Sequence, residues 1–266
     1  MEKFAVLGAG HGIGLSIAEG IRSAGITKEK IVITRKSSPF SDEEKVFECT
    51  YDNKKAVASS NIIIIAVQPG QVDELLKEVK SVLTEQHLLI SVVSGLEIKQ
   101  IQAVVGKIPI ARAMPNIAIK VKESMTSLTL SKEGEKHNAL VKSIFDSVGL
   151  TLVIPENKFP EATGLFGSGP AFGLKYIRAY MQACIQNGFN EKDSLMIAIQ
   201  VIKGAVMLLE TTGSHPEVEI DRVTTPGGCT IRGIVGMAHA GFDSALIKGT
   251  EVCIERAREL YQKKNK

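Results

Sequence analysis

The stretch FAVLGAGHGIGLSIAEG, residues 4 to 20, decides the fold of this chain. It begins with a short apolar run, passes through a glycine-rich turn, and continues in a helical pattern. Glycine allows a tight turn, and a helix N-terminus presents N–H groups and partial positive charge to a phosphate. A strand, a glycine turn and a helix in this order form the phosphate-binding unit of dinucleotide-binding folds.

The glycine pattern departs in one place from the GxGxxG fingerprint, because Ile13 stands where the third glycine is expected. Taken alone, the motif is therefore only moderately specific, and a glycine-rich turn that binds no nucleotide is the alternative. The strand before the turn and the helix after it favour a site for the cofactor pyrophosphate.

Further strands and helices alternate through the first half of the chain, which predicts a doubly wound parallel sheet of Rossmann type. Helical patterns such as GLSIAEGIRSAG and VDELLKEVKSVL separate most of the strand candidates, and a helix is expected from about residue 133 to 148. The apolar run IIIIAV fits a strand that is covered on both faces. The expected strands are FAVLGAG (4–10), IVIT (31–34), NIIIIAV (61–67), HLLISVV (87–93), PIARAM (109–114), MTSLTLS (125–131) and LTLVIP (150–155).

The end of the second strand indicates which cofactor is preferred. An acid at this position accepts the ribose hydroxyls of NAD, whereas basic residues hold the 2′-phosphate of NADP. The stretch TRKSS, residues 34 to 38, offers two cations and three hydroxyls, and no acid lies between Lys30 and Ser41. NADP(H) is therefore the predicted cofactor, with NAD(H) as the alternative. The competing interpretation is that Arg35 and Lys36 only solvate a loop.

The second half of the chain shows helical patterns alone, over residues 170–187, 191–211, 215–223, 228–240 and 243–264. This predicts a dinucleotide-binding domain at 1–157 and an all-helical substrate-binding and dimerisation domain at 158–266. Segment 194–209 is apolar almost all round, so it needs enclosure on every side. Because a small helical domain has few elements to supply that, an intertwined homodimer is predicted. Gln200 and Lys203 argue against a membrane anchor here.

The stretch TTPGGCTIRGIVGMA, residues 224 to 238, predicts a second anion site. Pro226, Gly227 and Gly228 precede a helix whose first turn holds Thr230, so bare backbone N–H groups can converge on an anion while the hydroxyl reaches a ligand. None of the five histidines is a convincing catalytic base. Oxidation of an alcohol needs a base, whereas reduction of a protonated imine needs mainly orientation. A carboxylate beside a ring nitrogen would suit this stretch, and another small anionic substrate would also fit.

Composition excludes several other classes of protein. The net charge of +3 comes from basic residues spread along the chain, so no nucleic-acid partner is expected. The four cysteines show no CxxC pair and no histidine at ligand spacing, so neither a disulfide framework nor a metal site is predicted. The N-terminus MEKFAVLGAG suits a strand better than a secretory signal. A cytoplasmic protein is expected.

With these residues in view, the chain resembles the pyrroline-5-carboxylate reductases, which reduce a cyclic imine to L-proline with NAD(P)H, the last step of proline biosynthesis. The resemblance runs nearly end to end, and its most specific part is GSGPA followed by HP and then TPGGxTI. The segments that carry it are LGAGHGIG (7–14), DNKKAV (52–57), IIIIAVQP (62–69), SVVSGLEI (91–98), RAMPN (112–116), FPEATGLFGSGPAF (159–172), ETTGSHPE (210–217), VTTPGGCTIRGI (223–234) and GFDSALIKGTEVCIERAREL (241–260).

The resemblance implies site residues in both halves, and it allows a higher oligomer built from dimers. The substrate carboxylate would lie against Pro226, Gly227, Gly228, Cys229 and Thr230, with the Thr230 hydroxyl as the catalytic contact to the ring nitrogen. The implied cofactor residues are Leu7, Gly8, Ala9, Gly10, His11 and Gly12 around the pyrophosphate, Arg35, Lys36, Ser37 and Asn53 on the adenosine side, Ala66, Val67, Gln68, Pro69, Val93, Ser94 and Gly95 along the cleft, and Met114, Pro115 and Asn116 near the nicotinamide.

The chain also departs from the family pattern. Gln68 replaces the more frequent Lys and removes a positive charge from the cleft, Ile117 and Ala118 replace Thr-Pro after MPN, and Cys229 stands where Thr or Ala is common. Two alternatives therefore stay open. The first is a reductase of another cyclic imine or a small hydroxyacid dehydrogenase on the same fold, for which Lys175 is the nearest candidate base. The second is an NADP-binding sensor without catalytic activity, which would have no need of TPGGCT.

Overall fold

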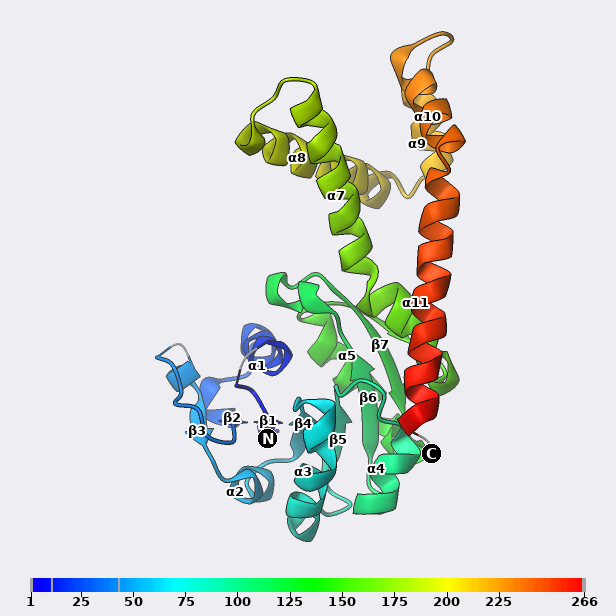
Figure 1. Cartoon of the computed structure of the whole chain (residues 1–266). Helices are drawn as coiled ribbons and strands as arrows, with labels where there is room; N and C mark the ends of the chain where they lie inside the picture. The colour runs from blue at the N-terminus through cyan, green and yellow to red at the C-terminus, as the bar shows by residue number, and fades with distance from the viewer. Residues whose placement is uncertain (1, 11, 43, 265–266) are drawn as a thin grey trace. The chain divides into compact units, whose positions relative to one another are not determined.

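The computed structural model describes residues 2–10, 12–42 and 44–264 of the chain. By its contacts the chain divides into two compact units, which are described separately. The first unit comprises Met1–Ser168 together with Ile254–Lys266, and the second comprises Gly169–Cys253. The first unit is an α/β domain and the second is all-helical (Figure 1).

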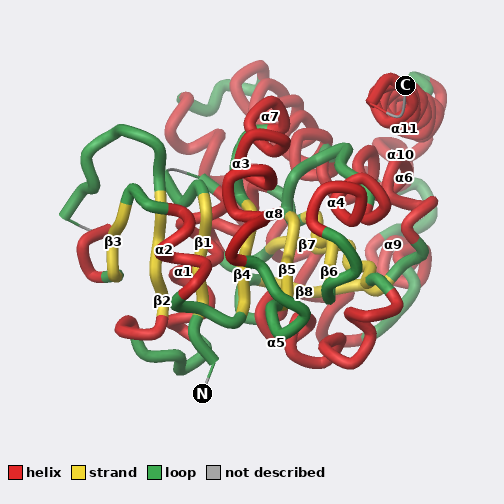
Figure 2. The backbone as a smooth tube through the Cα atoms, turned by 90° about the horizontal axis from the view of Figure 1, so that it is seen from below, coloured by secondary structure: helices red, strands yellow, loops and turns green. Residues whose placement is uncertain are grey.

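The first unit is built on one sheet of eight strands in the order β3-β2-β1-β4-β5-β6-β7-β8. Figure 2 shows β3, β2, β1, β4 and β5 side by side from left to right. The first six strands of this order reproduce the arrangement of dinucleotide-binding sheets. The strands are β1 (Phe4–Leu7), β2 (Ile31–Thr34), β3 (Glu48–Thr50), β4 (Ile62–Ile65), β5 (Leu88–Ser91), β6 (Ile110–Met114), β7 (Ser124–Leu130) and β8 (Gly149–Val153).

The pairing is parallel from β3 through β6, antiparallel between β6 and β7, and parallel again between β7 and β8. The predicted doubly wound parallel sheet is confirmed, except that β6 and β7 pair antiparallel. The reason is the connection: only the 3₁₀-helix Ile117–Val121 and its flanking residues join β6 to β7. A parallel crossover needs about a dozen residues or more, usually with an α-helix, so this short link returns the chain antiparallel.

Helices cover both faces of the sheet, as the doubly wound prediction requires. Alternate residues of β1 enter opposite cores, Phe4 and Val6 on one side and Ala5 and Leu7 on the other. The first core is closed by α1 and α5, and the second by α2, α3 and α4. These helices are α1 (Ile13–Ser23), α2 (Asn53–Ala58), α3 (Val72–Val79), α4 (Ile98–Val105) and α5 (Asn138–Asp146).

The second unit consists of helices, in agreement with the sequence pattern. They are α7 (Gly169–Gln186), α8 (Glu191–Thr212), α9 (Pro216–Val223), α10 (Cys229–His239) and the first part of α11 (Phe242–Lys264). Helix α8 begins at the N-cap Asn190, whose side chain accepts from the Asp193 amide, and ends at Gly213 in the left-handed conformation.

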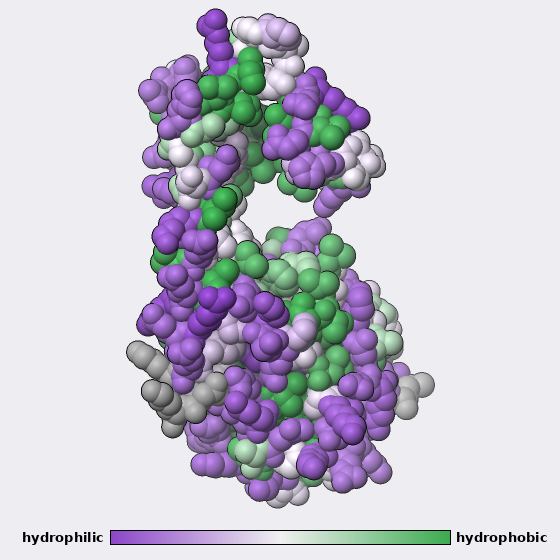
Figure 3. Space-filling model, turned by 90° about the vertical axis from the view of Figure 1, so that its right-hand side faces the viewer, coloured by the Kyte–Doolittle hydropathy of each residue, from purple (hydrophilic) through white to green (hydrophobic). Residues whose placement is uncertain are grey.

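Helix α8 leaves most of its apolar surface uncovered within the single chain. Ser194 and Ala198 are its buried residues, while Met196 and Ile199 are exposed. Figure 3 shows hydrophobic patches on the surface of the helical unit. Among the described residues, α8 is also the helix long and apolar enough to cross a membrane by length and composition, a test that core helices of soluble proteins pass as well. The helices of the second unit therefore do not supply the enclosure expected for this segment.

The two units do not coincide with the expected domains 1–157 and 158–266. The short helix α6 (Phe159–Ala162) and the π-helical turn Thr163–Gly167 belong to the first unit, as does the C-terminal part of α11. Phe159 and Tyr261 are buried together with Met114, which holds these segments against the sheet. The functional division of the chain into a cofactor domain and a substrate domain stays a prediction.

Candidate functional site

The glycine turn after β1 has the geometry that a pyrophosphate needs. Gly8 has φ +86°, and a Cβ there would lie 2.6 Å from Val67 Cγ1, so only glycine fits. No side chain of the described residues caps the N-terminus of α1, which leaves its first N–H groups available to an anion. A Cβ on Gly14 would lie 3.0 Å from Ala66 Cβ. Gly14 thus provides the close helix–strand packing that the fingerprint assigns to position 13.

A pocket of about 550 Å³ opens beside this turn. It lies at the carboxyl ends of the parallel strands, where ligands bind in open α/β sheets. Its lining residues are Gly8, Gly10, Thr34, Arg35, Lys36, Ser38, Tyr51, Asn53, Ala66, Val67, Gln68, Gln71, Glu74, Leu75 and Glu78. Eight of the predicted cofactor residues are among them: Gly8, Gly10, Arg35, Lys36, Asn53, Ala66, Val67 and Gln68.

Arg35 lines the pocket, but its guanidinium is turned into the protein. The residue is 7% exposed and forms an ion pair with the buried carboxylate of Glu44. It also donates to the carbonyls of Pro39 at 2.5 Å and Gly10 at 2.8 Å, and lies 4.5 Å from the centre of the Phe40 ring. Its Nε is buried without a hydrogen-bond partner among the described residues. Arg35 therefore ties the β2 loop to the glycine turn and leaves one donor unused.

Lys36 is the exposed cation of this pocket, and two carboxylates accompany it. Its Nζ lies 3.4 Å from Glu74 Oε2, and both side chains are 74% exposed. Glu78 accepts from Asn53 Nδ2 at 3.1 Å, and the Thr34 hydroxyl donates to Asn53 Oδ1 at 2.6 Å. The adenosine side of the pocket is thus electrostatically mixed rather than simply basic.

Sequence reasoning missed the contribution of α3 to this pocket. Glu74 and Glu78 lie four positions apart on α3 and so share one side of the helix, next to Leu75, and Gln71 lies just before the helix. The pattern VDELLKEV predicts a helix between two strands. The spacing of Glu74 and Glu78, one turn apart beside the apolar stripe, is the signal that could have identified them.

The remaining predicted cofactor residues do not line this pocket. They lie at or near the same carboxyl ends of the strands. Met114 ends β6 and is 7% exposed; Asn116 is buried, and its Nδ2 donates to the Phe166 carbonyl at 2.9 Å. Gly95 has φ +70° in the loop after β5. The others of this set are Leu7, Ala9, Gly12, Ser37, Pro69, Val93, Ser94 and Pro115, and His11 falls outside the described residues.

In the second unit, the TPGG stretch forms a turn directly before α10. Gly228 N donates to the Thr225 carbonyl at 2.9 Å, and Gly227 has φ +71°. Proline followed by a glycine of positive φ is the sequence pattern of a type II turn. Gly228 is the N-cap of α10 and no side chain of the described residues caps this helix. The turn therefore presents uncapped N–H groups to an anion.

Thr230 and Cys229 are both exposed at the start of α10. No hydrogen bond to another described residue occupies the Thr230 hydroxyl in the structure. Lys175, the candidate base of a dehydrogenase, is exposed on α7. No disulfide joins the described cysteines, and the described residues contain no cluster of side chains suited to a metal ion.

The fold and the pocket place this chain in the class of NAD(P)-dependent oxidoreductases with a Rossmann-type sheet followed by a helical domain. A family model described as pyrroline-5-carboxylate reductase dimerisation matches residues 156–260, and one described as NADP oxidoreductase, coenzyme F420-dependent, matches residues 3–95. Together with the relatives described next, these matches show that the chain belongs to the pyrroline-5-carboxylate reductase family.

Two curated relatives come from Dictyostelium discoideum. Pyrroline-5-carboxylate reductase 2 is 39% identical over an alignment that covers 100% of this chain and 95% of the length of that relative. Pyrroline-5-carboxylate reductase 1 is 40% identical over 98% of this chain, which spans only 50% of that longer protein. Among solved structures, the pyrroline carboxylate reductase of Plasmodium falciparum, with NADP bound, superimposes with a TM-score of 0.87 at 26% identity, covering 98% of both chains.

Proposed function

We propose that this protein reduces 1-pyrroline-5-carboxylate to L-proline with NAD(P)H. The observation that carries the proposal is the uncapped N-terminus of α10 behind the Thr225–Gly228 turn, with the Thr230 hydroxyl exposed in the first helical turn. This arrangement offers backbone donors for a carboxylate and one hydroxyl for a neighbouring ring nitrogen. The relatives named as reductases of this imine support the same substrate.

The residues of the chain have separate roles in this reaction. Pro226 and Gly228 shape the turn. The backbone N–H groups of Gly227 and Cys229 hold the carboxylate, and Thr230 hydrogen-bonds the ring nitrogen and orients the imine. The cofactor, when bound, would supply the hydride for the imine carbon. The ring nitrogen takes its proton from solvent before the transfer, and the Thr230 hydroxyl is its hydrogen-bond partner. A protonated imine is already electrophilic, so orientation accounts for most of the work that remains.

The cofactor fits the first unit. Gly8 lets the backbone come close to a pyrophosphate, and the N-terminus of α1 has no side-chain cap among the described residues. The Nε of buried Arg35, which has no partner in the described part of the chain, suits an adenosine phosphate. NADP(H) is the proposed preference, with NAD(H) accepted less well. Because the Arg35 guanidinium is paired with Glu44, the exposed charge available to the 2′-phosphate is that of Lys36, supported by the hydroxyl of Ser37.

A homodimer built on the helical domain is part of the proposal. The exposed apolar side chains of α8 need a cover, and the helical region matches a model named for dimerisation. The family resemblance allows dimers to assemble further. A cytoplasmic location and the absence of nucleic-acid and membrane partners are proposed on the sequence arguments given above.

The test is turnover of the purified protein with DL-1-pyrroline-5-carboxylate, with NADPH and NADH in parallel and proline measured by mass spectrometry. We expect proline with both cofactors and a higher kcat/KM with NADPH. Thr230→Ala should lower kcat/KM by about 1 to 2 kcal/mol, or roughly five- to thirtyfold, because one substrate hydrogen bond is lost. Thr230→Ser keeps the hydroxyl and should retain most of the activity.

One result would redirect the proposal. If NADPH binds but no proline forms, the departures at Gln68 and Ile117 become the leading observations, and other cyclic imines are the next substrates to try. Ile117 is 58% exposed directly after the MPN segment, so it is available to contact a different substrate.

A further inference from the structure

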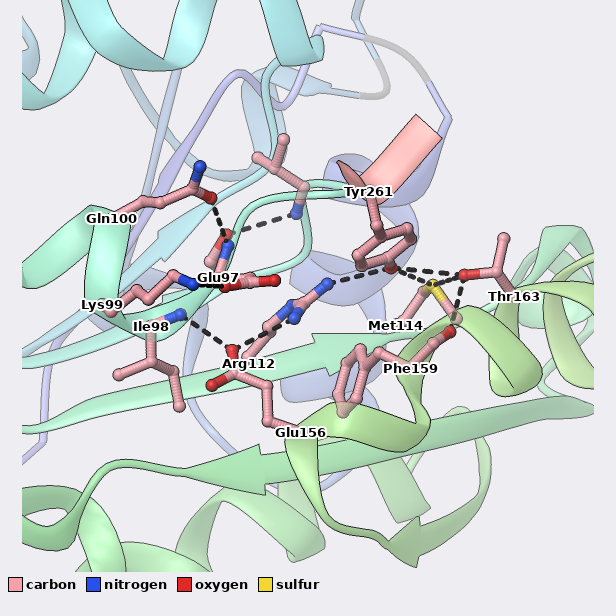
Figure 4. A network of polar contacts seen from close by, with 12 residues as sticks. Glu97, Ile98, Lys99, Gln100, Arg112, Met114, Glu156, Phe159, Thr163 and Tyr261 are labelled. Atoms are coloured by element: carbon pink, nitrogen blue, oxygen red, sulfur yellow. Dashed lines mark hydrogen bonds and ion pairs between the residues drawn. The ribbon is translucent and has the colours of Figure 1, made fainter. Parts of the chain in front are cut away.

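A buried cation lies at the centre of the first unit, two residues before the end of β6. Arg112 is 1% exposed, and its guanidinium is held between two partners (Figure 4). Its Nη1 donates to Glu156 Oε1 at 3.1 Å and its Nη2 donates to Tyr261 Oη at 2.9 Å. The ring centres of Phe159 and Tyr261 lie 4.2 and 5.2 Å from its Cζ.

Stability alone does not account for such a residue. A buried ion pair must offset the desolvation of both charges, and well-packed apolar residues of similar volume often stabilise a core as well or better. The pair is better explained by what it holds in place. Its partners come from three separate segments of the chain: the turn after β8, helix α6 and the last turns of α11.

One arm of the network leads to the loop after β5. Besides pairing with Arg112, Glu156 Oε1 accepts from the backbone N–H of Ile98 at 2.8 Å. Ile98 is the first residue of α4, and the loop just before it contains Val93–Gly95, which we propose to line the cofactor cleft. The position of this loop is therefore tied to Arg112 through a single carboxylate oxygen.

The other arm leads to Met114, which we propose to lie near the nicotinamide. Met114 Sδ is 3.9 Å from Tyr261 Oη and 3.3 Å from Thr163 Oγ1, and these two oxygens are 3.2 Å apart. Met114 and Arg112 are two residues apart on β6, so both side chains lie on the same face of the sheet. The thioether is flexible by nature, and these two hydroxyls hold it in place.

We propose that Arg112 is a positioning residue, which through Glu156 and Tyr261 fixes the Val93–Gly95 loop and Met114 relative to each other and so sets how the nicotinamide ring is held. This inference rests on the proposed function. Arg112 does not touch the cofactor itself, because its guanidinium is enclosed by protein. The pocket with the proposed adenosine half shares no residue with this network.

Tyr261→Phe is the test, because it keeps the buried ring and removes only the hydroxyl that joins Arg112 to Met114. We expect the variant to fold and to bind 2′,5′-ADP, a probe of the adenosine half alone, with a Kd within about twofold of the parent. The emission of bound NADPH, which reports how rigidly the reduced ring is held, should fall. The kcat for proline formation should fall by about five- to fiftyfold, since small misplacements of reacting groups are costly.

The matched control is Glu161→Gln. The Arg258–Glu161 ion pair, at 2.7 Å, also joins α11 to α6 but is not part of the Arg112 network. Glu161→Gln should leave both NADPH emission and kcat unchanged. Arg112→Lys tests the centre directly, and it should reproduce the Tyr261→Phe pattern because one ammonium cannot serve both arms.

Two results would overturn the inference. In the first, Tyr261→Phe leaves NADPH emission and kcat at the parent values. In the second, Glu161→Gln causes the same losses of NADPH emission and kcat, which would mean that the network only stabilises the position of α11. Failure of the proposed function is separate, because the parent protein would then form no proline, whereas the emission of bound NADPH and the 2′,5′-ADP affinity would still report on the network.

Discussion

The substitution Glu74→Gln should strengthen NADPH binding more than NADH binding. Glu74 lines the adenosine side of the pocket and pairs with Lys36, the exposed cation there. A 2′-phosphate bound at Lys36 would lie close to the Glu74 carboxylate, and the two negative charges would repel. A glutamine side chain at this position would keep the size and hydrogen-bonding capacity of the glutamate while removing that charge.

The size of the effect follows from the distance and the exposure. The carboxylate lies 3.4 Å from Lys36 Nζ, so a phosphate on the other side of that ammonium would lie about 6 Å away, where two unit charges in water interact by roughly 0.7 kcal/mol. The phosphate carries more than one charge, but salt screening and the 74% exposure of both side chains reduce the effect. We expect about 0.5 to 1 kcal/mol, or a two- to fivefold lower Kd for NADPH.

The measurement is a pair of binding titrations with NADPH and NADH, at low and at physiological ionic strength. The chain contains no Trp, so the emission of the reduced cofactor can be followed without tryptophan background. The gain for NADPH should shrink as salt is added. Asp73→Asn is the control, because Asp73 is exposed on the same helix but does not line the pocket.

Equal changes for NADPH and NADH would refute this reasoning, since NADH has no 2′-phosphate to respond to the charge. Weaker NADPH binding would refute it as well. That result would mean that Glu74 mainly serves to orient Lys36.

Three further predictions concern other parts of the two sites. Gly8→Ala should lower the free energy of unfolding by about 1 to 3 kcal/mol and weaken cofactor binding, because the φ of Gly8 is +86° and a Cβ would overlap a neighbouring side chain. Denaturant titration would measure the first effect and a cofactor titration the second. Parent values in both would contradict the close contact at Gly8. Glu44→Gln should lower the free energy of unfolding by about 2 to 4 kcal/mol, since Arg35 would keep a buried charge without its anion. A loss below about 0.5 kcal/mol in urea unfolding would show that the ion pair is effectively solvated. Alkylation of the exposed Cys229 thiol, followed by peptide mass spectrometry, should slow when saturating L-proline and NADP occupy the site, and an unchanged rate would place the carboxylate elsewhere.

Much of the fold could be predicted from the sequence because local patterns determine it. The β-branched runs became β1, β2, β4, β5 and β6, and the helical patterns of the second half became α7 to α11. The short strand β3 was missed because Glu48–Thr50 has no alternating or continuous apolar pattern. The antiparallel direction of β7 was missed because strand direction depends on the length of a connection, not on the composition of the strand itself.

The sites were less accessible to sequence reasoning, because side-chain direction is decided by tertiary packing. Arg35 lines the pocket, as its place in TRKSS predicts, but its ion pair with Glu44, nine positions later, could not be predicted from that motif. The acids of α3 line the pocket only because that helix packs into the same core as β1 and β4. Arg112 and Tyr261 are 149 positions apart, so no local pattern could join them. The roles of Thr230 and of the predicted cofactor residues stay predictions.

The most direct test of the account is the fate of a labelled hydride. NADPH that carries deuterium at both C4 positions of the nicotinamide would be mixed with the protein and 1-pyrroline-5-carboxylate, and the product would be analysed by mass spectrometry. We expect L-proline with a single deuterium, on the ring carbon that was the imine carbon of the substrate. Unlabelled proline, or no proline from protein that binds NADPH, would contradict it.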